Sequence, residues 1–438
     1  MIDDVRPPER PAPKPKVPAD SPEVAVDNSP APVEQDPPAQ AEPARKTDDM
    51  DIETIELPDK PDKTDKPKRW QRFLPKTKKQ KIIVGILVAV IILGGGAGAW
   101  MATHHKQTPV KKVAAIKPAK PKQVLYSKLS GLPIADDSSN NQPVVAVMVE
   151  NSLDARPQSG LSNAGIVYEA VAEGGITRFM ALYQGDLPSN VGPVRSARPY
   201  YVSWALGYNA VYAHVGGSPD ALSDIAAWGV QDLNQFYNDS AYKRIDSRAA
   251  PHNVYTNVNS LLQLAATKGL NDTGYTPFDR KADQPYTAPK PAAGKPASKS
   301  VDNRIAANSI DISISGADYD PHYDYIASTN SYARSEAGQA QTDDNTGKQL
   351  SPKVVVAIVL PLTQGALDAS GAYYSNYNTL GSGQAVVFQD GVVEQATWHK
   401  DINSDSLTLT DTNGKALKLN RGQTWITAVT APNKVSYK

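Results

Sequence analysis

Two arginines three positions apart are the first residues with clear binding chemistry. Arg195 and Arg198 flank Ser196 in VGPVRSARPYYVSW, residues 191–204, just before an apolar, aromatic-rich run. The pattern predicts a helix over 197–206 with Ser196 as its N-cap. A guanidinium offers a planar, always-charged fork for carboxylate or phosphate, and a positive charge at a helix start opposes the helix dipole by roughly 0.3–1 kcal/mol. The pair therefore indicates an anion, from an outside ligand or from the protein itself; alternatively, the arginines are solvated surface charge.

Two glutamates on a predicted strand supply the internal alternative. Glu169 and Glu173 lie four positions apart in GIVYEAVAE, residues 165–173, so a regular strand would place both on one face. Four residues along a strand span about 13 Å, which exceeds the usual separation of the two carboxylates of a glycosidase. We therefore expect these glutamates to be ligand-binding groups or ion-pair partners of the arginines, not a pair of glycosidase carboxylates.

A glycine turn between a predicted strand and a predicted helix is a second candidate anion site. In His214-Val-Gly-Gly-Ser218-Pro, two glycines let the chain turn closely before a helix begins. Free N–H groups at such a crevice favour phosphate, carboxylate or an oxyanion, so Gly216, Gly217 and Ser218 would form the cradle. Alternatively, Ser218 is only a helix cap and the glycines serve only the turn.

The motif Arg248-Ala-Ala-Pro-His252-Asn253 adds a histidine beside an amide in a predicted loop. His214, Ser218 and His252 are the residue types of nucleophilic catalysis, and they are the catalytic candidates. No Gly-x-Ser-x-Gly elbow occurs, and no acid is evidently paired with either histidine. We also count Arg248, His252 and Asn253 among the candidate ligand-binding residues, and leave open whether the protein is an enzyme.

Several chemistries are excluded by composition. The chain has 438 residues, no cysteine and six histidines without a His-x-x-x-His pair, so neither a thiol nucleophile nor a metal site is expected. No Walker loop or dinucleotide fingerprint is present, and we expect no cofactor. The basic run 66–81 suits membrane topology and anionic lipid better than nucleic acid, which is not an expected partner.

The chain divides by composition. IIVGILVAVIILGGGAGAWM, residues 82–101, carries no charge and matches a bilayer core of about 30 Å, and the more basic flank before it places the N-terminus in the cytoplasm. Ala97-Gly98-Ala99 resembles a signal-peptidase site, but some eighty residues precede it, and we favour retention as a single-pass anchor. The predicted segments are a disordered Pro-rich tail (1–81), a transmembrane helix (82–101), a Lys/Pro-rich spacer (102–124), a first folded region (125–283), a linker (284–300) and a second folded region (301–438).

The two folded regions differ in their patterns. The first mixes predicted strands with predicted helices and is α/β or α+β. Its strands are predicted at 143–149, 165–173, 176–184 and 210–215, and its helices at 197–206, at 219–228 between Pro219 and Gly229, and at 257–268 with Thr256 as cap and Gly269 as stop. The second region is mainly antiparallel β, with turn signals at Asp390-Gly391 and Asn413-Gly414. Its strands are predicted at 354–361, 384–389, 392–399, 407–410, 416–419 and 424–429.

Long motifs resemble a known family. DARPQSGLSNAGIVYEAVAEGGITRFMALYQ (154–184), GPVRSARPYYVSWALGYNAVYAHVGGSP (192–219) and RAAPHNVYT (248–256) are similar to the YerB-like bacterial extracytoplasmic proteins, which contain the N- and C-terminal parts of domain of unknown function 3048. GSGQAVVFQDGVVEQATWHK (381–400) and LNRGQTWITAV (419–429) resemble the second part. The resemblance implies an envelope location, a two-domain build and no established activity. A lipoprotein needs an N-terminal cysteine, and here a predicted transmembrane helix stands in its place.

Three functions follow as hypotheses. The first is a membrane-anchored extracytoplasmic protein that binds an anionic or carbohydrate envelope ligand. The second is a hydrolase or transferase acting on cell-wall polymers, and the third is an envelope scaffold that binds a partner protein.

Overall fold

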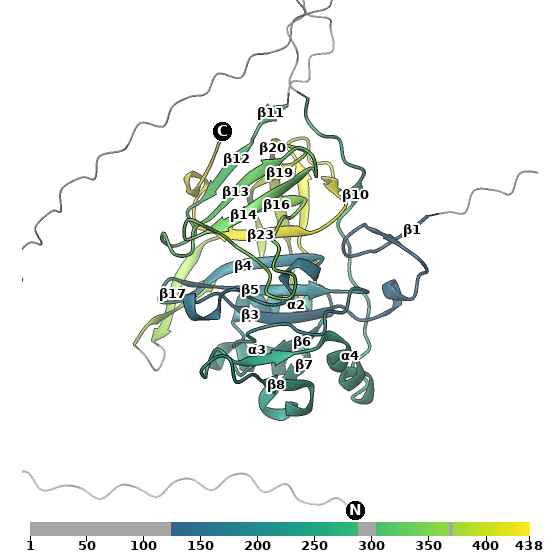
Figure 1. Ribbon diagram of the computed structural model, residues 1–438, viewed down its shortest axis with the longest axis vertical. Coiled ribbons are helices and arrows are strands. Elements are labelled where there is room, and N and C mark those ends of the chain that lie inside the picture. Colours follow the sequence, from purple (N-terminus) through teal and green to yellow (C-terminus); the bar gives the residue numbers. More distant parts are fainter. Residues whose placement is uncertain (1–123, 288–303, 368–370) are drawn as a thin grey trace, which may run out of the picture. The chain divides into compact units, whose positions relative to one another are not determined.

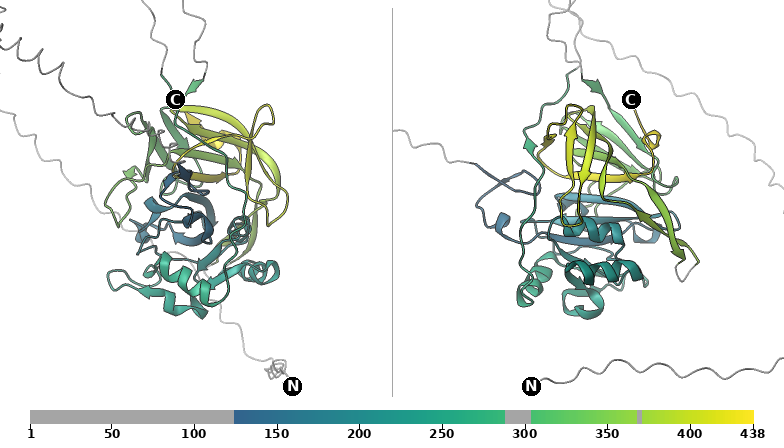
Figure 2. Two further views of the ribbon diagram at one scale, coloured as in Figure 1. Left: turned by 90° about the vertical axis from the view of Figure 1, so that its right-hand side faces the viewer. Right: turned by 180° about the vertical axis from the view of Figure 1, so that it is seen from behind.

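Strands dominate the part of the chain that the structure describes (Figures 1 and 2). The computed structural model describes residues 124–287, 304–367 and 371–438, which fall within one compact unit, Ile116–Lys438. Among these residues no helix is long and apolar enough to cross a membrane. The predicted tail and transmembrane helix, most of the spacer and most of the linker lie outside the described residues, so the anchor and the domain boundary stay predictions.

One large sheet takes strands from both sequence regions. Its central strands run in the order β11-β20-β19-β16-β23-β4-β5-β3-β6-β7. The bounds are β3 (Val145–Glu150), β4 (Ile166–Glu173), β5 (Ile176–Tyr183), β6 (Val211–His214), β7 (Gln231–Asn234), β11 (Ile305–Ala306), β16 (Val354–Val359), β19 (Gly381–Gln389), β20 (Val392–Lys400) and β23 (Thr424–Val429). The regions join where β23 pairs with β4 in parallel, with Thr427 opposite Glu169. In Figure 1 the blue strands β3, β4 and β5 accordingly lie next to the yellow β23.

Helices cover both faces of the first region's strands, which explains why those strands are apolar on both sides. All six residues of β3 are buried, as expected for a strand enclosed between two layers. On one face Tyr201 and Trp204 of α2 join the core, and on the other face Leu261 of α4 does so. The α-helices in the described residues are α2 (Pro199–Leu206), α3 (Pro219–Trp228) and α4 (Val258–Thr267).

A second sheet of five strands covers part of the second region. Its order is β15-β14-β13-β12-β24, and Tyr323 and Tyr332 pack with Val355 and Phe388 of the large sheet. Sequence patterns predicted none of these five strands. Their bounds are β12 (Ser309–Ile312), β13 (Pro321–Ile326), β14 (Ser331–Glu336), β15 (Gln339–Ala340) and β24 (Val435–Tyr437).

Shorter elements complete the structure. The remaining strands are β1 (Leu125–Tyr126), β2 (Pro133–Ile134), β8 (Tyr242–Arg244), β9 (Val254–Thr256), β10 (Arg280–Lys281), β17 (Leu362–Leu367), β18 (Tyr373–Tyr377), β21 (Thr408–Asp411) and β22 (Leu419–Asn420). The 3-10 turns are η1 (Ser139–Asn141), η2 (Leu153–Ala155), η3 (Leu161–Asn163), η4 (Gln235–Tyr237), η5 (Asp239–Ala241) and η6 (Pro432–Lys434). The predicted Asp390-Gly391 hairpin joins β19 to β20, and both residues have positive φ, at 59° and 75°.

The predicted helix ends are correct for α3 and wrong for α2. The start and stop of α3 are as predicted: the Ser218 hydroxyl accepts from the Ala221 N–H at 3.4 Å, and Gly229 ends the helix with φ of 67°. Ser196 as cap of α2 is wrong, because that helix begins at Pro199 with Arg198 at the N-cap and no side-chain cap. Ala197 pairs with Gly217 of the glycine turn, so the chain stays extended at residue 197 and the helix begins two residues later.

The cap predicted for α4 is also wrong, by one residue. Asn257 accepts from the Ser260 N–H at 3.2 Å and is the N-cap. Thr256 is instead the last residue of β9, and its backbone pairs with Val191. A tertiary strand pairing therefore replaced the cap that the local pattern favoured.

Candidate functional site

The candidate residues gather where parallel strands of the large sheet end. β3 and β4 both run antiparallel to β5, while β6 runs parallel to β3, so these three strands end at one edge. Ligands of open sheets with parallel strands collect at such an edge. Glu150 is the last residue of β3 and begins the segment Glu150–Gln158, here called the 150–158 segment.

Glu150 brings two predicted residues together. Its Oε1 lies 3.2 Å from Arg195 Nε and 3.0 Å from His252 Nδ1, and it accepts from the Ser152 hydroxyl at 2.8 Å. Glu150 is 3% exposed, whereas the Arg195 and His252 side chains are 24% and 22% exposed. Among the described residues, the two terminal nitrogens of Arg195 have no hydrogen-bond partner, so both remain available to a ligand.

Arg198 has a different environment from Arg195. Its Nε donates to Glu173 Oε2 at 3.0 Å, and its Nη2 lies 2.7 Å from Glu173 Oε1. The guanidinium also lies 4.8 Å from the centre of the Tyr374 ring. Arg178 contacts the same Glu173 carboxylate, and burial, followed by the charge of Arg198, lowers the pKa of Arg178. The internal glutamate is therefore the partner of Arg198, which holds the start of α2.

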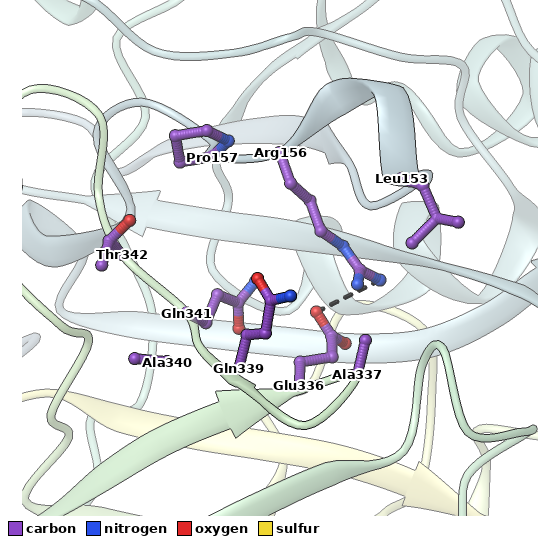
Figure 3. Close-up of a pocket in the computed structure, with 9 residues that line it drawn as sticks. All are labelled: Leu153, Arg156, Pro157, Glu336, Ala337, Gln339, Ala340, Gln341 and Thr342. Carbon is purple, nitrogen blue, oxygen red and sulfur yellow. Dashed lines mark ion pairs between the residues drawn. The ribbon is translucent and has the colours of Figure 1, made fainter. Parts of the chain in front are cut away.

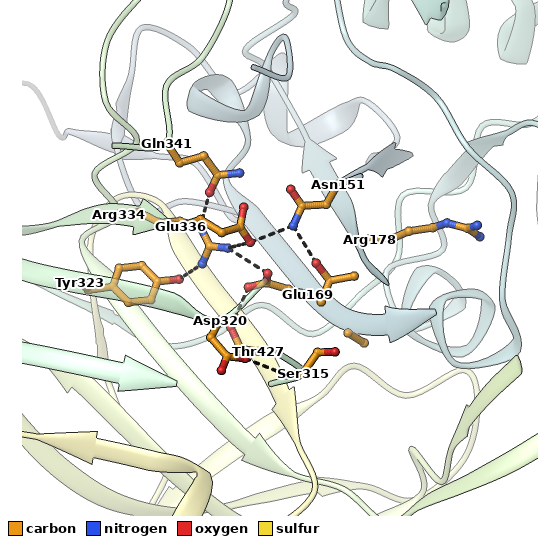
Figure 4. A network of polar contacts seen from close by, with 12 residues as sticks. Asn151, Glu169, Arg178, Ser315, Asp320, Tyr323, Arg334, Glu336, Gln341 and Thr427 are labelled. Carbon is orange, nitrogen blue, oxygen red and sulfur yellow. Dashed lines mark hydrogen bonds and ion pairs between the residues drawn. The ribbon is translucent and has the colours of Figure 1, made fainter. Parts of the chain in front are cut away.

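Glu169 belongs to another network, shown in Figure 4. Arg334 on β14 places Nη2 2.8 Å from Glu169 Oε1 and 3.2 Å from Glu336 Oε1, and all three side chains are buried. The Thr427 hydroxyl donates to Glu169 Oε2 at 3.3 Å, and Arg334 Nη1 donates to the Tyr323 hydroxyl at 2.5 Å. A regular strand would place Glu169 and Glu173 on one face, but a register shift follows residue 171, so this condition is not met, and the two carboxylates bind different arginines.

Burial perturbs both carboxyl groups of this network. Burial raises the pKa of Glu169, and Arg334 only partly opposes that shift. Burial likewise raises the pKa of Glu336 to about 7, with Arg334 lowering it and Glu169 raising it further. The carboxyl group with this raised pKa, that of Glu336, lies at the wall of a cleft.

That cleft lies between the 150–158 segment and the β14–β15 hairpin (Figure 3). Its volume is about 320 Å³, and Arg156 and Glu336 meet in it at 3.3 Å. Asn151 connects the cleft to the interior, since its amide donates to Thr177 at 2.7 Å and to Glu336 at 2.8 Å.

His214 and Ser218 do not join these clusters. His214 is fully buried, with Nδ1 2.7 Å from the Gly216 carbonyl and Nε2 2.8 Å from Asp232. Ser218 is 3% exposed and caps α3. The Gly216 N–H donates to Asn234 at 3.0 Å, so a protein oxygen already fills this part of the predicted cradle. Gly217 pairs with the chain at residue 197.

The motif of residues 248–253 is hydrogen-bonded to the 150–158 segment through Arg248. Arg248 donates to the carbonyls of Asp154 and Pro157 at 3.0 and 2.7 Å. Asn253 accepts from Arg244 at 2.8 Å and does not reach the cluster around Glu150. Within the described ranges, no three His, Asp or Glu side chains gather in a way that could hold a metal ion.

Sequence reasoning missed Glu150, Arg156, Arg334 and Glu336. A polar residue ending the apolar run PVVAVMV is the signal that would have singled out Glu150. Arg334 and Glu336 carry no such signal, because SYARSE does not indicate what lies opposite it. Three of the motifs quoted above for the family resemblance, at 154–184, 192–219 and 248–256, all contribute to the surroundings of the 150–158 segment.

Two parts of the chain match a family of proteins of unknown function. Residues 129–271 match the N-terminal domain of a protein of unknown function (DUF3048), and residues 310–426 match its C-terminal domain. The chain is 32% identical over 306 residues to a Bacillus subtilis (strain 168) protein named "Putative lipoprotein YerB", covering 70% of this chain and 86% of that protein. It is also similar to the crystal structure of the YerB protein from Bacillus subtilis, with a TM-score of 0.60 and 29% identity over 72% of this chain and 99% of the other.

Proposed function

The chain belongs to the DUF3048 family, and from that premise we propose that it is a membrane-anchored extracytoplasmic protein that binds an anionic group of a cell-envelope ligand. The word "lipoprotein" in the relative's name supports the envelope location. The uncharged run 82–101 supports a transmembrane anchor in place of a lipid.

The two terminal nitrogens of the Arg195 guanidinium carry this proposal. Arg198 contacts Glu173 through both Nε and Nη2, but Arg195 contacts Glu150 only through Nε. Its terminal nitrogens meet no hydrogen-bond acceptor among the described residues, and its side chain is 24% exposed. A carboxylate or phosphate from outside would complete the fork in the bidentate arrangement that guanidinium favours.

Glu150 orients the site. It holds Arg195 and His252 through the same oxygen, which fixes both side chains before a ligand arrives. Among the described residues, the other ring nitrogen of His252 has one polar partner within 4.0 Å, the exposed Asp154 carboxylate. His252 thus offers a second polar contact beside the Arg195 fork.

The geometry supports binding better than nucleophilic hydrolysis. A serine nucleophile needs a histidine nitrogen to take its proton while a carboxylate holds the other nitrogen. Here the Ser152 hydroxyl donates to Glu150, and Ser152 and Glu150 both lie on the Nδ1 side of His252, at 3.4 and 3.0 Å. Among the catalytic candidates, His214 and Ser218 are buried within the protein's own contacts.

Calorimetry with the full-length chain in detergent tests the proposal. The probes are poly(glycerol phosphate) and soluble muropeptides, with variants Arg195→Gln and, as a matched control, Arg421→Gln, whose side chain stacks on Tyr126. We expect Arg195→Gln to weaken binding about tenfold, the cost of roughly one charge-assisted contact, and Arg421→Gln to leave it unchanged. Equal binding by the wild type and Arg195→Gln would remove the site, and no binding of either probe by the wild type would remove the function.

A further inference from the structure

The cleft over Arg156 and Glu336 uses none of the side chains of the Arg195–His252 site. One wall is formed by residues 153–157 and the other by the β14–β15 hairpin, from a distant part of the sequence (Figure 3). Apolar groups of Leu153 and Ala340 line it beside the charged pair. Its volume, about 320 Å³, falls at the lower end of small-ligand sites.

One carboxylate oxygen of Glu336, which lines this cleft, makes no hydrogen bond to the described residues. Its Oε1 accepts from Asn151 and contacts Arg334, at 2.8 and 3.2 Å. Its Oε2 is buried without a hydrogen-bond donor among the described residues, and its ion-pair contact to Arg156 Nη2 measures 3.3 Å. Glu336 is 4% exposed overall, and leaving a buried polar atom unpaired is costly. The site therefore gains from a ligand that donates a hydrogen bond.

Arg156 supplies the complementary donor in a fixed position. Its Nε donates to Asn151 Oδ1 at 3.1 Å, and its Nη2 donates to the Asn151 and Asp318 carbonyls at 3.0 and 2.7 Å. The guanidinium also lies 5.2 Å from the centre of the Tyr319 ring. Its Nη1 has no hydrogen-bond partner in the described part of the chain, so one donor of a rigid guanidinium stays available next to the acceptor.

We propose that this cleft binds a glycan, with a sugar hydroxyl that donates to Glu336 Oε2 and accepts from Arg156 Nη1. A hydroxyl is both donor and acceptor, so a single group supplies the hydrogen bonds that these two atoms lack. The inference goes beyond the anion site, since it rests on different residues and either site can function without the other.

The charge balance favours a neutral ligand. While both glutamates are ionised, Arg156 and Arg334 are matched by Glu169 and Glu336, so the connected network then has no net formal charge. An anion would face the Glu336 carboxylate, and a cation would face Arg156. A peptide N–H only donates and a peptide C=O only accepts, so an added strand along the short edge strand β15 would satisfy the pair less well than adjacent hydroxyls.

Saturation-transfer NMR and calorimetry with the full-length chain in detergent test the glycan site. The probes are N-acetylglucosamine tetramer and cellotetraose, with tetra-alanine as the peptide alternative. Ala340→Trp fills the cleft from an exposed strand position, and Ala366→Trp makes the same change on exposed β17. Thermal melting of both variants checks that each is folded.

We expect the wild type and Ala366→Trp to bind at least one glycan equally, and Ala340→Trp to bind it at least about tenfold more weakly. Arg195→Gln is expected to keep full glycan binding, which separates this site from the anion site. Glycan binding that survives Ala340→Trp, or no glycan binding by the wild type, overturns the proposal. Binding of tetra-alanine without glycan binding also overturns it, in favour of strand addition at β15.

Discussion

Arg334 Nη2 lies 2.8 Å from Glu169 Oε1, and this buried ion pair joins the two segments that match the family (Figure 4). The residues are 165 positions apart in the chain, and both side chains are fully buried. The Trp425 ring packs against the guanidinium at 4.3 Å, beside the β4–β23 pairing that joins the same segments. The pair therefore fixes how β14 packs over the large sheet and supports Glu336 at the cleft.

Removing the arginine should destabilise the protein strongly. Arg334→Met leaves Glu169 and Glu336 buried without their shared cation, and we expect the free energy of unfolding at pH 7.5 to fall by about 3–5 kcal/mol. Urea denaturation followed by tryptophan fluorescence measures it. Arg421→Met removes an arginine that stacks on Tyr126, and should cost less than about 1 kcal/mol. Similar losses in the two variants would contradict the role assigned to Arg334.

Glu336 should make stability depend on pH in the direction opposite to that of a salt-bridged carboxylate. Its pKa is raised by burial from 4.5 to about 7 in the folded protein, so between these values the folded state keeps a proton that the unfolded state has released. Its contribution is fully present below about pH 4.5 and is lost as the pH rises through about 7. We expect Glu336→Gln to remove this loss, which is on the order of 3 kcal/mol.

The measurement compares the free energy of unfolding at pH 5 and pH 8 in the wild type and in Glu336→Gln. The relevant quantity is the difference between their pH dependences, because the raised pKa of Glu169 acts in the same direction in both proteins. Glu394→Gln, at a residue outside this network, serves as the control and should follow the wild type. Parallel curves for the wild type and Glu336→Gln would show that Glu336 does not titrate as argued.

Ser196 and Ser218 both lie just before a helix, yet replacing them should change the free energy of unfolding by different amounts. Ser218→Ala removes the hydroxyl that caps α3 and should cost about 1 kcal/mol, while Ser196→Ala should cost less than about 0.5 kcal/mol because Ser196 caps no helix. Thermal or urea unfolding measures both. Binding of poly(glycerol phosphate) should be the same in the two variants, and a selective loss of binding in Ser218→Ala would instead return Ser218 to the ligand site.

Short-range patterns located strands β3 to β6 and the three α-helices of the first region, but not its other strands. Strands β3 to β6 lie within two residues of their predicted positions, and the Ser218–Gly229 signals bounded α3 correctly. These features depend on side-chain alternation and on hydrogen bonds between residues at most a few positions apart, which a local stretch of sequence contains. The same reasoning failed at Ser196, where pairing with the distant glycine turn overrode the local cap signal.

The partners of the charged residues were decided by the tertiary structure. The sequence left open whether Arg195 and Arg198 pair with Glu169 or Glu173, bind an outside anion or are surface charge. The tertiary arrangement assigned Glu173 to Arg198, Glu150 to Arg195 and Glu169 to Arg334. These pairings depend on which strands lie side by side and on the register shift in β4. The sequence states which side chains carry charge. The distances between them depend on which strands pair and in what register, and residues far apart in the sequence determine that pairing.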